Sequence, residues 1–204
     1  MKNIFKNIAV FLVLSVVLSG FVACTKTTNV SNGSVSDTAG SDTSSAPPKN
    51  NNFPPAPSAI MQADIKDLDG NTFKLEDKKG KVVLVNLWGI WCGPCVAEMP
   101  ALMALQEKYK DKDFEVIGLN IGDQDGSVEP AENIKAFAEK KSLNYQLAYA
   151  DEDLFSHFVK LSKLAAVPQS LLIDRDGRMT GVFAGGGSRV INQIKETVEK
   201  TVGE

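Results

Sequence analysis

The chain has 204 residues, of which 43% are apolar and 23% are charged, and its formal net charge is −3. These values are ordinary for a globular protein and allow one domain or two small ones. Charges of both signs are interspersed and no basic block is present, so we expect neither a nucleic-acid partner nor a polybasic membrane patch.

The N-terminal segment has the pattern of an export signal. Lys2 and Lys6 give it a positive start, and an uncharged apolar run covers residues 8–23. This run is short for a membrane-spanning helix, which needs about 20 residues. A basic start, an apolar middle and a small final residue are typical of a signal peptide, so we expect residues 1–23 to form one.

Residues 21–24, "FVAC", resemble the lipobox of bacterial lipoproteins. The resemblance implies that Cys24 is lipidated, becomes the new N-terminus and anchors the protein to the bacterial cell membrane on its extracytoplasmic side. Phe21 stands where that motif usually has Leu. Cleavage by ordinary signal peptidase, or retention of the segment as an anchor, therefore remain alternatives.

The segment from residue 24 to residue 58 reads as a disordered tether. Ser, Thr, Asn, Gly, Asp and Pro dominate it, and aliphatic residues almost vanish. Such a composition buries too little apolar surface to offset the entropy lost on ordering. A flexible segment of about 34 residues spans roughly 30 Å on average, with a stiffer Pro-rich end. That length would hold a domain clear of a bilayer surface.

The three cysteines are Cys24, Cys92 and Cys95. An odd count in an exported protein needs an explanation. Lipidation of Cys24 would remove it from the thiol pool and leave a single pair, with none to spare for structural disulfides. The domain expected at residues 59–204, about 145 residues, is long enough to be held together by its hydrophobic core.

That domain should begin with a hairpin and a buried strand. Residues 63–75 alternate in polarity around Asp69-Gly70, a dipeptide typical of hairpin turns. Residues 81–88, "KVVLVNLW", are apolar and β-branched almost throughout, which indicates a central strand buried on both faces.

A helix should follow, beginning near Pro94, because the first helical turn tolerates the missing N–H of proline. One side of it carries apolar residues at helical spacing, and Pro100 within it should produce a kink. The apolar residues are Met99, Leu102, Leu105 and Tyr109.

The rest of the chain alternates between strands and helices. Strands are expected at residues 114–121, 144–149, 170–173 and 179–184, and helices at residues 131–141, 153–161 and 188–202. Asp176-Gly177 should form the turn of the last hairpin. The buried face of the last helix should carry Ile191, Ile194 and Val198. This order predicts an α/β protein with a mixed central sheet.

The motif "WCGPC" at residues 91–95 joins the buried strand to the helix and indicates dithiol chemistry. Cys92 would lie at the helix N-terminus, where unpaired N–H groups and the macrodipole favour a thiolate and so lower the pKa of Cys92. Cys95 would lie one turn further in and be shielded. Cys92 can then attack a target disulfide, and Cys95 can release the reduced target by attacking Cys92.

Two other uses of the cysteine pair are weaker. A structural zinc site needs four ligands, but there is no second cysteine pair and His157 is the only histidine, so we expect neither a metal nor another cofactor. A purely structural disulfide between Cys92 and Cys95 would close so short a loop that it would add little stability.

The stretches "VVLVNLWGIWCGPCVAEMPAL" and "AAVPQSLLIDRDG" together resemble the thioredoxin superfamily. More closely, they are similar to the membrane-tethered TlpA/ResA-like thiol–disulfide oxidoreductases. The resemblance covers about residues 60–204. It implies a thioredoxin fold with a mixed central sheet, an N-terminal β-hairpin, and a central strand–helix insertion within residues 123–161.

The resemblance also implies where a target binds. Pro168 takes the position of the family's cis-proline, which faces the cysteine pair, and the Val167 backbone would pair with an incoming strand. Trp91, together with Gly93 and Pro94 of the motif, should complete the substrate-binding surface. Trp88 reads as a core residue. Gly185-Gly186-Gly187 should form the turn into the last helix, close enough to the cysteines for a substrate backbone to approach.

This chain departs from the thioredoxins at two positions. Asn86 stands where they carry a buried Asp, and Gly118 appears where they carry a Lys. An amide cannot accept a proton as a carboxylate can. Glu98 lies three residues after Cys95, on the same helix face, and TlpA/ResA-like proteins have a Glu there. The resemblance therefore implies that Glu98 exchanges the proton of Cys95, with a pKa raised by shielding.

Three rival functions can be weighed. The peroxiredoxin signature would place Pro and Thr where this chain has Val85 and Gly89. Copper-delivering relatives use C-x-x-x-C with a distant histidine, and the spacing here is one residue shorter. A disulfide-forming oxidase of the DsbA kind would share the fold, but Gly93-Pro94 resembles the reducing members.

We therefore expect an extracytoplasmic enzyme that reduces protein disulfides. The family implies a CcdA- or DsbD-like membrane protein as electron donor. It also implies apocytochrome c, or an exported methionine sulfoxide reductase, as target. The cysteine count and the tether suggest a monomer.

Overall fold

The computed structural model describes residues 53–204. The expected signal peptide at residues 1–23, the lipidation of Cys24 and most of the tether lie outside the described residues. Within residues 53–204, no helix is both long enough and apolar enough to span a bilayer.

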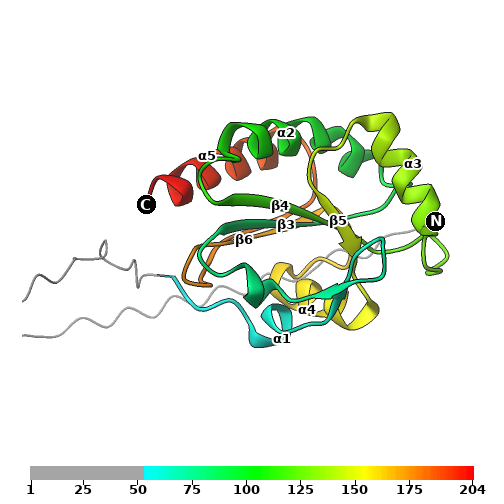
Figure 1. The fold of residues 1–204 in the computed structure, drawn as a ribbon, viewed down its shortest axis with the longest axis horizontal. Coiled ribbons are helices and arrows are strands. Elements are labelled where there is room, and N and C mark those ends of the chain that lie inside the picture. Colours follow the sequence, from blue (N-terminus) through cyan, green and yellow to red (C-terminus); the bar gives the residue numbers. More distant parts are fainter. Residues whose placement is uncertain (1–52) are drawn as a thin grey trace, which may run out of the picture. The chain divides into compact units, whose positions relative to one another are not determined.

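The centre of the domain is a five-stranded sheet with the order β5-β4-β3-β6-β7 (Figure 1). Its strands are β3 (Val82–Trp88), β4 (Phe114–Asn120), β5 (Gln146–Tyr149), β6 (Gln169–Ile173) and β7 (Met179–Ala184). β3 runs parallel to β4, and β4 to β5, whereas β6 is antiparallel to both β3 and β7. The predicted mixed α/β sheet is confirmed.

Helices cover both faces of this sheet. On one face lie α2 (Gly93–Tyr109) and α5 (Ser188–Gly203), and on the other lie α1 (Ser58–Met61) and α4 (Glu152–Ser162), as Figure 1 shows. The insertion between β4 and α4 contains α3 (Ala131–Lys141) and β5. α2 runs uninterrupted through Pro100, which is exposed. On α5, Ile194 and Val198 are buried as expected, whereas Ile191 in the first turn is only partly buried.

The middle strand, β3, is buried along its whole length. Its β-branched and aliphatic residues suit a position between two layers of helices. Val83, Val85 and Leu87 pack toward α1 and α4. Leu84 and Trp88 pack toward the side of α2. Because side chains alternate along a strand, Asn86 shares the α2 side with Leu84 and Trp88.

The predicted hairpin is also confirmed. β1 (Ile65–Lys66) pairs antiparallel with β2 (Thr72–Phe73). The turn contains Gly70 at φ +86°, a conformation that glycine adopts without steric cost. A short 3₁₀ helix, η1 (Leu75–Lys78), which the sequence did not predict, leads from the hairpin to β3.

The folded domain begins before the expected boundary at residue 59. The Met179 N–H donates to the Pro54 carbonyl at 2.9 Å, and the Ala56 N–H donates to the Gly177 carbonyl at 3.0 Å. Arg178 adds a hydrogen bond from Nη1 to the Phe53 carbonyl at 2.8 Å. The composition of this segment resembles a linker, but its backbone carbonyls at Phe53 and Pro54 and its N–H at Ala56 still pair with the last hairpin. Residues 53–56, which the sequence assigned to the tether, are therefore bonded to the folded domain.

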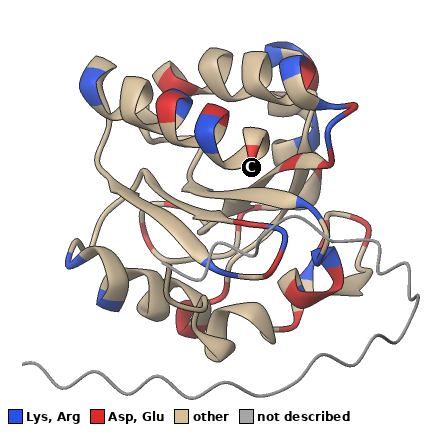
Figure 2. Cartoon of the chain, turned by 90° about the vertical axis from the view of Figure 1, so that its left-hand side faces the viewer, with Lys and Arg blue, Asp and Glu red and all other residues tan. Residues whose placement is uncertain are grey.

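Charged residues of both signs are interspersed along the domain. On the face drawn in Figure 2, acidic and basic residues lie close to one another without a block of one sign. This distribution agrees with the interspersed charges of the sequence.

Candidate active site

The two cysteines lie where β3 gives way to α2. Cys92 is the N-cap residue of α2, and it forms a disulfide with Cys95 in the first turn. The Cys95 backbone N–H points at the Cys92 Sγ across 3.2 Å. An N–H donor and the positive end of the helix dipole both favour negative charge on the Cys92 sulfur. The predicted position of Cys92 at a helix N-terminus is confirmed.

The pair differs in access. Cys92 is 4% exposed and Cys95 is fully buried. Gly93 and Pro94, the two residues between them, are both exposed, and so is Trp91. A target can therefore reach the Cys92 side of the disulfide, whereas Cys95 is shielded by the first turns of α2.

The Val167–Pro168 peptide bond is cis, as the sequence predicts. The Val167 carbonyl oxygen lies 3.7 Å from the Cys92 Sγ, so this loop forms the wall opposite the cysteine. Gln169 fastens the loop, because its side-chain Nε2 donates to the carbonyls of Leu164 at 2.8 Å and Ala166 at 2.6 Å. The loop is thus held close to the reacting sulfur by hydrogen bonds within its own segment.

The glycine run before α5 completes this surface. A Cβ at Gly186 would lie 2.8 Å from the Pro94 Cβ and 3.6 Å from the Pro168 Cγ. Only a residue without a side chain therefore fits between these two prolines. The run does form the turn into α5, and it lies beside the cysteine pair.

Trp91, the residue before Cys92, also borders the cysteine pair. Its indole Nε1 donates to the Gly122 carbonyl at 2.9 Å, and 39% of its surface remains exposed. A Cβ at Gly89 would lie 2.8 Å from the indole ring. Gly89 therefore makes room for the Trp91 ring, which stays partly exposed. Trp88, by contrast, is fully buried and packs against the tilted Phe137 ring with 5.5 Å between the ring centroids, which identifies it as core.

Glu98 is the unusual group of the site, because it is a carboxyl that is only 1% exposed. The Asn86 Nδ2 donates to its Oε1 at 2.7 Å and to the Ser170 Oγ at 3.0 Å. Burial raises the pKa of Glu98 to about 7, against the opposing effect of the Asn86 hydrogen bond. Glu98 therefore changes its protonation state near neutral pH.

The pairing explains the departure at Asn86. An amide nitrogen carries two hydrogens, and here each has an acceptor, one on Glu98 and one on Ser170. A carboxylate in place of Asn86 would stand against Glu98 with a like charge at hydrogen-bond distance. The acidic group that thioredoxins carry on the strand is thus carried here by the helix, and the strand supplies its donor.

The departure at Gly118 has an equally direct cause. Gly118 of β4 pairs with Asn86 of β3 in the sheet. A Cβ there would lie 2.8 Å from the Leu147 Cδ2, and 3.1 Å from both the Trp88 Nε1 and the Tyr145 Cε2. These three side chains fill the space that a larger residue would need. The approach of Tyr145 was missed from the sequence, where it lies between two polar residues and carries no local signal.

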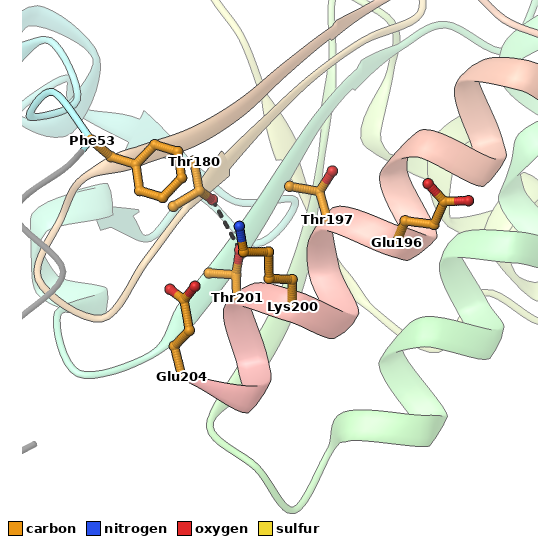
Figure 3. Close-up of a pocket in the computed structure, with 7 residues that line it drawn as sticks. All are labelled: Phe53, Thr180, Glu196, Thr197, Lys200, Thr201 and Glu204. Carbon is orange, nitrogen blue, oxygen red and sulfur yellow. Dashed lines mark hydrogen bonds between the residues drawn. The ribbon is translucent and has the colours of Figure 1, made fainter.

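A separate pocket lies between the C-terminal half of α5 and the start of β7 (Figure 3). Its volume is about 260 Å³. It is lined by Phe53, Thr180, Glu196, Thr197, Lys200, Thr201 and Glu204. No cysteine lines it, and it is not part of the redox site. Among residues 53–204, no group of three or more His, Cys, Asp or Glu side chains is placed to hold a metal ion.

Comparison with known proteins agrees with this geometry. The Redoxin family matches residues 48–198. The thiol-disulfide oxidoreductase ResA of Bacillus thuringiensis subsp. konkukian (strain 97-27) is 34% identical over 136 residues, which cover 67% of this chain and 72% of that protein. The ResA of Geobacillus thermodenitrificans (strain NG80-2) is 31% identical over 135 residues, covering 66% of this chain and 71% of that protein.

A solved structure supports the fold as well. The crystal structure of a thiol:disulfide interchange protein of the thioredoxin family from Chlorobium tepidum TLS superposes with a TM-score of 0.59 at 25% sequence identity. The match covers 74% of this chain and 97% of that chain. Together with the cysteine pair at the start of α2, these likenesses show that the chain belongs to the Redoxin family and is a thiol–disulfide oxidoreductase of the ResA type, with Cys92 and Cys95 as its redox pair.

Proposed function

We propose that this enzyme reduces disulfides of other proteins, and that Glu98 supplies the proton transfer that its resolving cysteine needs. The observation that carries the proposal is the placement of a buried carboxyl one helical turn after a buried disulfide sulfur, that of Cys95. Cys95 is fully buried, and Glu98 has a pKa of about 7. A base with a pKa close to the working pH is the most effective one.

The reaction would run in two exchanges. In the dithiol enzyme, the Cys92 thiolate attacks a target disulfide, forms a mixed disulfide and displaces one target thiolate. Ionised Glu98 then takes the proton of the Cys95 thiol, and the Cys95 sulfur attacks Cys92. The second target thiolate leaves, and the enzyme is left with its Cys92–Cys95 disulfide. Two electrons pass to the target, and both leaving thiolates take up protons.

The exposed wall around Cys92 would hold the target. The Val167 backbone would pair with an extended target segment, while Trp91, Gly93, Pro94 and Pro168 would contact it on either side. None of these five residues carries a charge. The proposal therefore assigns target binding to backbone pairing and shape rather than to charge.

The N-terminal sequence supports an extracytoplasmic location. The proposed arrangement is a signal peptide at residues 1–23, a lipid on Cys24 and a tether that joins the membrane to the domain. A CcdA- or DsbD-like membrane protein would then return electrons to the Cys92–Cys95 disulfide. Apocytochrome c and an exported methionine sulfoxide reductase are the proposed targets.

The reduction potential of the full chain tests the direction of transfer. We expect a value below about −220 mV, near those of thioredoxin and glutaredoxin, after equilibration in glutathione or dithiothreitol buffers. A potential near about −120 mV, in the range of strongly oxidising DsbA, would overturn the proposal and make the protein a disulfide-forming oxidase.

Trapping tests the targets. Replacing the resolving cysteine (Cys95→Ser) should leave targets joined to Cys92 as mixed disulfides, which can be separated under non-reducing conditions and identified. The matched control is Cys92→Ser, which keeps one thiol but lacks the attacking one and should trap none of the same proteins. Equal capture by both variants would contradict the assigned roles. Stoichiometric copper on the purified protein would favour a copper-binding module instead.

A further inference from the structure

Two buried donors without hydrogen-bond partners lie on the same side of the sheet as Glu98. They are the Trp88 indole Nε1 and the Tyr145 hydroxyl. Buried polar atoms are nearly always paired, so an unpaired one in a native protein calls for an explanation. A group that has no partner in one protonation state can gain one when a neighbour ionises.

The sheet brings Tyr145 to Glu98 through Gly118. Gly118 and Asn86 are paired residues of two parallel strands, so both face the same side of the sheet. The Tyr145 ring lies over Gly118, 3.1 Å from the position of a Cβ there. Asn86 meets Glu98 at 2.7 Å on that same side. Tyr145 and Glu98 therefore approach the same pair of backbone positions from two different elements.

The electrostatics agree with this placement. Burial raises the pKa of Tyr145 above its ordinary value, and the negative charge of Glu98 raises it further. The hydroxyl consequently keeps its proton at neutral pH and remains a hydrogen-bond donor. Asn86 occupies the Glu98 Oε1, but each carboxylate oxygen has two lone pairs, so the ionised group can accept more hydrogen bonds.

We propose that Tyr145 is a positioning residue, whose hydroxyl donates a hydrogen bond to the Glu98 carboxylate when Glu98 ionises and thereby lowers the pH at which Glu98 becomes a base. The effect on Cys95 rests on the function proposed above, whereas the link between Tyr145 and Glu98 does not. No atom is transferred to or from Tyr145. The Tyr145 hydroxyl has no partner in this structure, so the contact forms by rotation of the Glu98 carboxyl toward it, while the Tyr145 ring stays packed over Gly118.

The groups that the structure places beside Glu98 and its donor Asn86 carry no charge in the oxidised protein. Cys95 lies one turn earlier on α2 and is bonded to Cys92 in the oxidised protein. Asn86 on β3 and Ser170 on β6 are neutral. In the oxidised protein the cysteines do not titrate, so Glu98 is the group whose ionisation Tyr145 would feel.

The test is the titration of Glu98 in the oxidised full chain, followed by the carbon-13 NMR shift of its side-chain carboxyl. Glu98→Gln identifies the signal. Tyr145→Phe keeps the ring and removes the hydroxyl, and it should raise the titration midpoint by about one pH unit, the usual strength of a hydrogen bond to a charged group. A midpoint that is unchanged or lower in Tyr145→Phe would overturn the inference.

Tyr149→Phe is the matched control. The Tyr149 hydroxyl donates to the Glu129 backbone carbonyl at 3.1 Å and has its own partner. Its removal should leave the Glu98 midpoint in place, and an equal shift in both variants would mean a general change in packing and would also overturn the inference. The catalytic role of Glu98 is judged separately, from the rate of Glu98→Gln. The Glu98 midpoint can therefore shift in Tyr145→Phe even if Glu98→Gln reacts as fast as the parent, and the reverse result is equally distinguishable.

Discussion

The two faces of β3 serve different purposes, although they belong to the same seven residues. On one face, Val83, Val85 and Leu87 pack into an entirely apolar cluster against α1 and α4. On the other face, Asn86 lies between Leu84 and Trp88 and binds a buried carboxyl. The apolar face only stabilises the fold, whereas the face with Asn86 lowers the stability of the fold because it holds the buried Glu98 carboxyl.

The cost of the reactive face can be stated. Burial moves the pKa of Glu98 from its ordinary value of 4.5 to about 7. At one pKa unit per roughly 1.4 kcal/mol, the ionised form is disfavoured in the folded protein by about 3 kcal/mol. That is a large share of the 5–15 kcal/mol by which a typical domain is stable. Substitutions on the two faces can separate these contributions.

Truncation on the apolar face should cost stability without touching the chemistry. Leu87 is fully buried. Leu87→Ala should lower the free energy of unfolding by about 2–5 kcal/mol through lost burial and a cavity. Urea denaturation measures the loss, and the exchange rate of the folded fraction should equal that of the parent. Val182→Ala, at a site 39% exposed on the edge strand β7, is the surface control and should cost much less.

The reactive face should make stability depend on pH. Glu98 binds its proton more tightly when folded, so its contribution is fully present below about pH 4.5 and is lost as the pH rises toward 7. Relative to Glu98→Gln, the parent should therefore lose about 3 kcal/mol across that window. Glu107→Gln, on the exposed surface of the same helix, should keep the parent's slope. Parallel stability curves for the parent and Glu98→Gln would contradict the buried carboxyl.

The same residue should control the second exchange. In Glu98→Gln, release of the target from Cys92 should slow by on the order of 10²-fold at neutral pH, because general base catalysis is lost. Rapid quenching with a thiol-alkylating reagent should then show that the mixed disulfide accumulates. In the parent, the rate should rise with pH through about 7 as Glu98 ionises. If the mixed disulfide decays equally fast in both proteins, Glu98 is not the base.

The packing over Gly118 should tolerate no side chain. Gly118→Ala places a methyl group 2.8 Å from Leu147 and 3.1 Å from both Trp88 and Tyr145. Overpacking of this kind costs about 1–3 kcal/mol, which thermal or urea unfolding can measure. Gly203→Ala, where a Cβ meets nothing within 4 Å, is the control. A stable Gly118→Ala protein would show that the Tyr145 ring is not held where the structure places it.

Much of the domain could be predicted because its signals are local. The apolar run of β3, the turn at Gly70 and the spacing of Met99 and Leu102 on α2 each reflect a backbone preference or a burial pattern within a few residues. The cis peptide bond before Pro168 was predicted because the stretch around it resembles the thioredoxin superfamily, which has a cis-proline at this position. Such features need no knowledge of the partner across the sheet.

The parts that were missed depend on contacts between distant segments. The segment from Phe53 reads as linker because its composition is Pro-rich, and only the last hairpin reveals its hydrogen bonds. Glu98 was expected near Cys95, but its donor Asn86 is 12 residues away on another element. Tyr145 reaches the site from the inserted segment before β5. In each case the residue is present in the sequence, but the residue that it contacts is known only from the fold.

The hydrogen bonds at Phe53, Pro54 and Ala56 also have a mechanical consequence. They hold the incoming chain to Gly177, Arg178 and Met179, in the turn before β7 and at its first residue. Just after β7, the Gly185 N–H donates to the Pro168 carbonyl beside the cysteines. Six residues of strand, about 20 Å, separate the two ends. A pull on the chain before Phe53 is therefore carried by the turn of the last hairpin. The loop that faces Cys92 lies at the opposite end of β7 and would not carry that load.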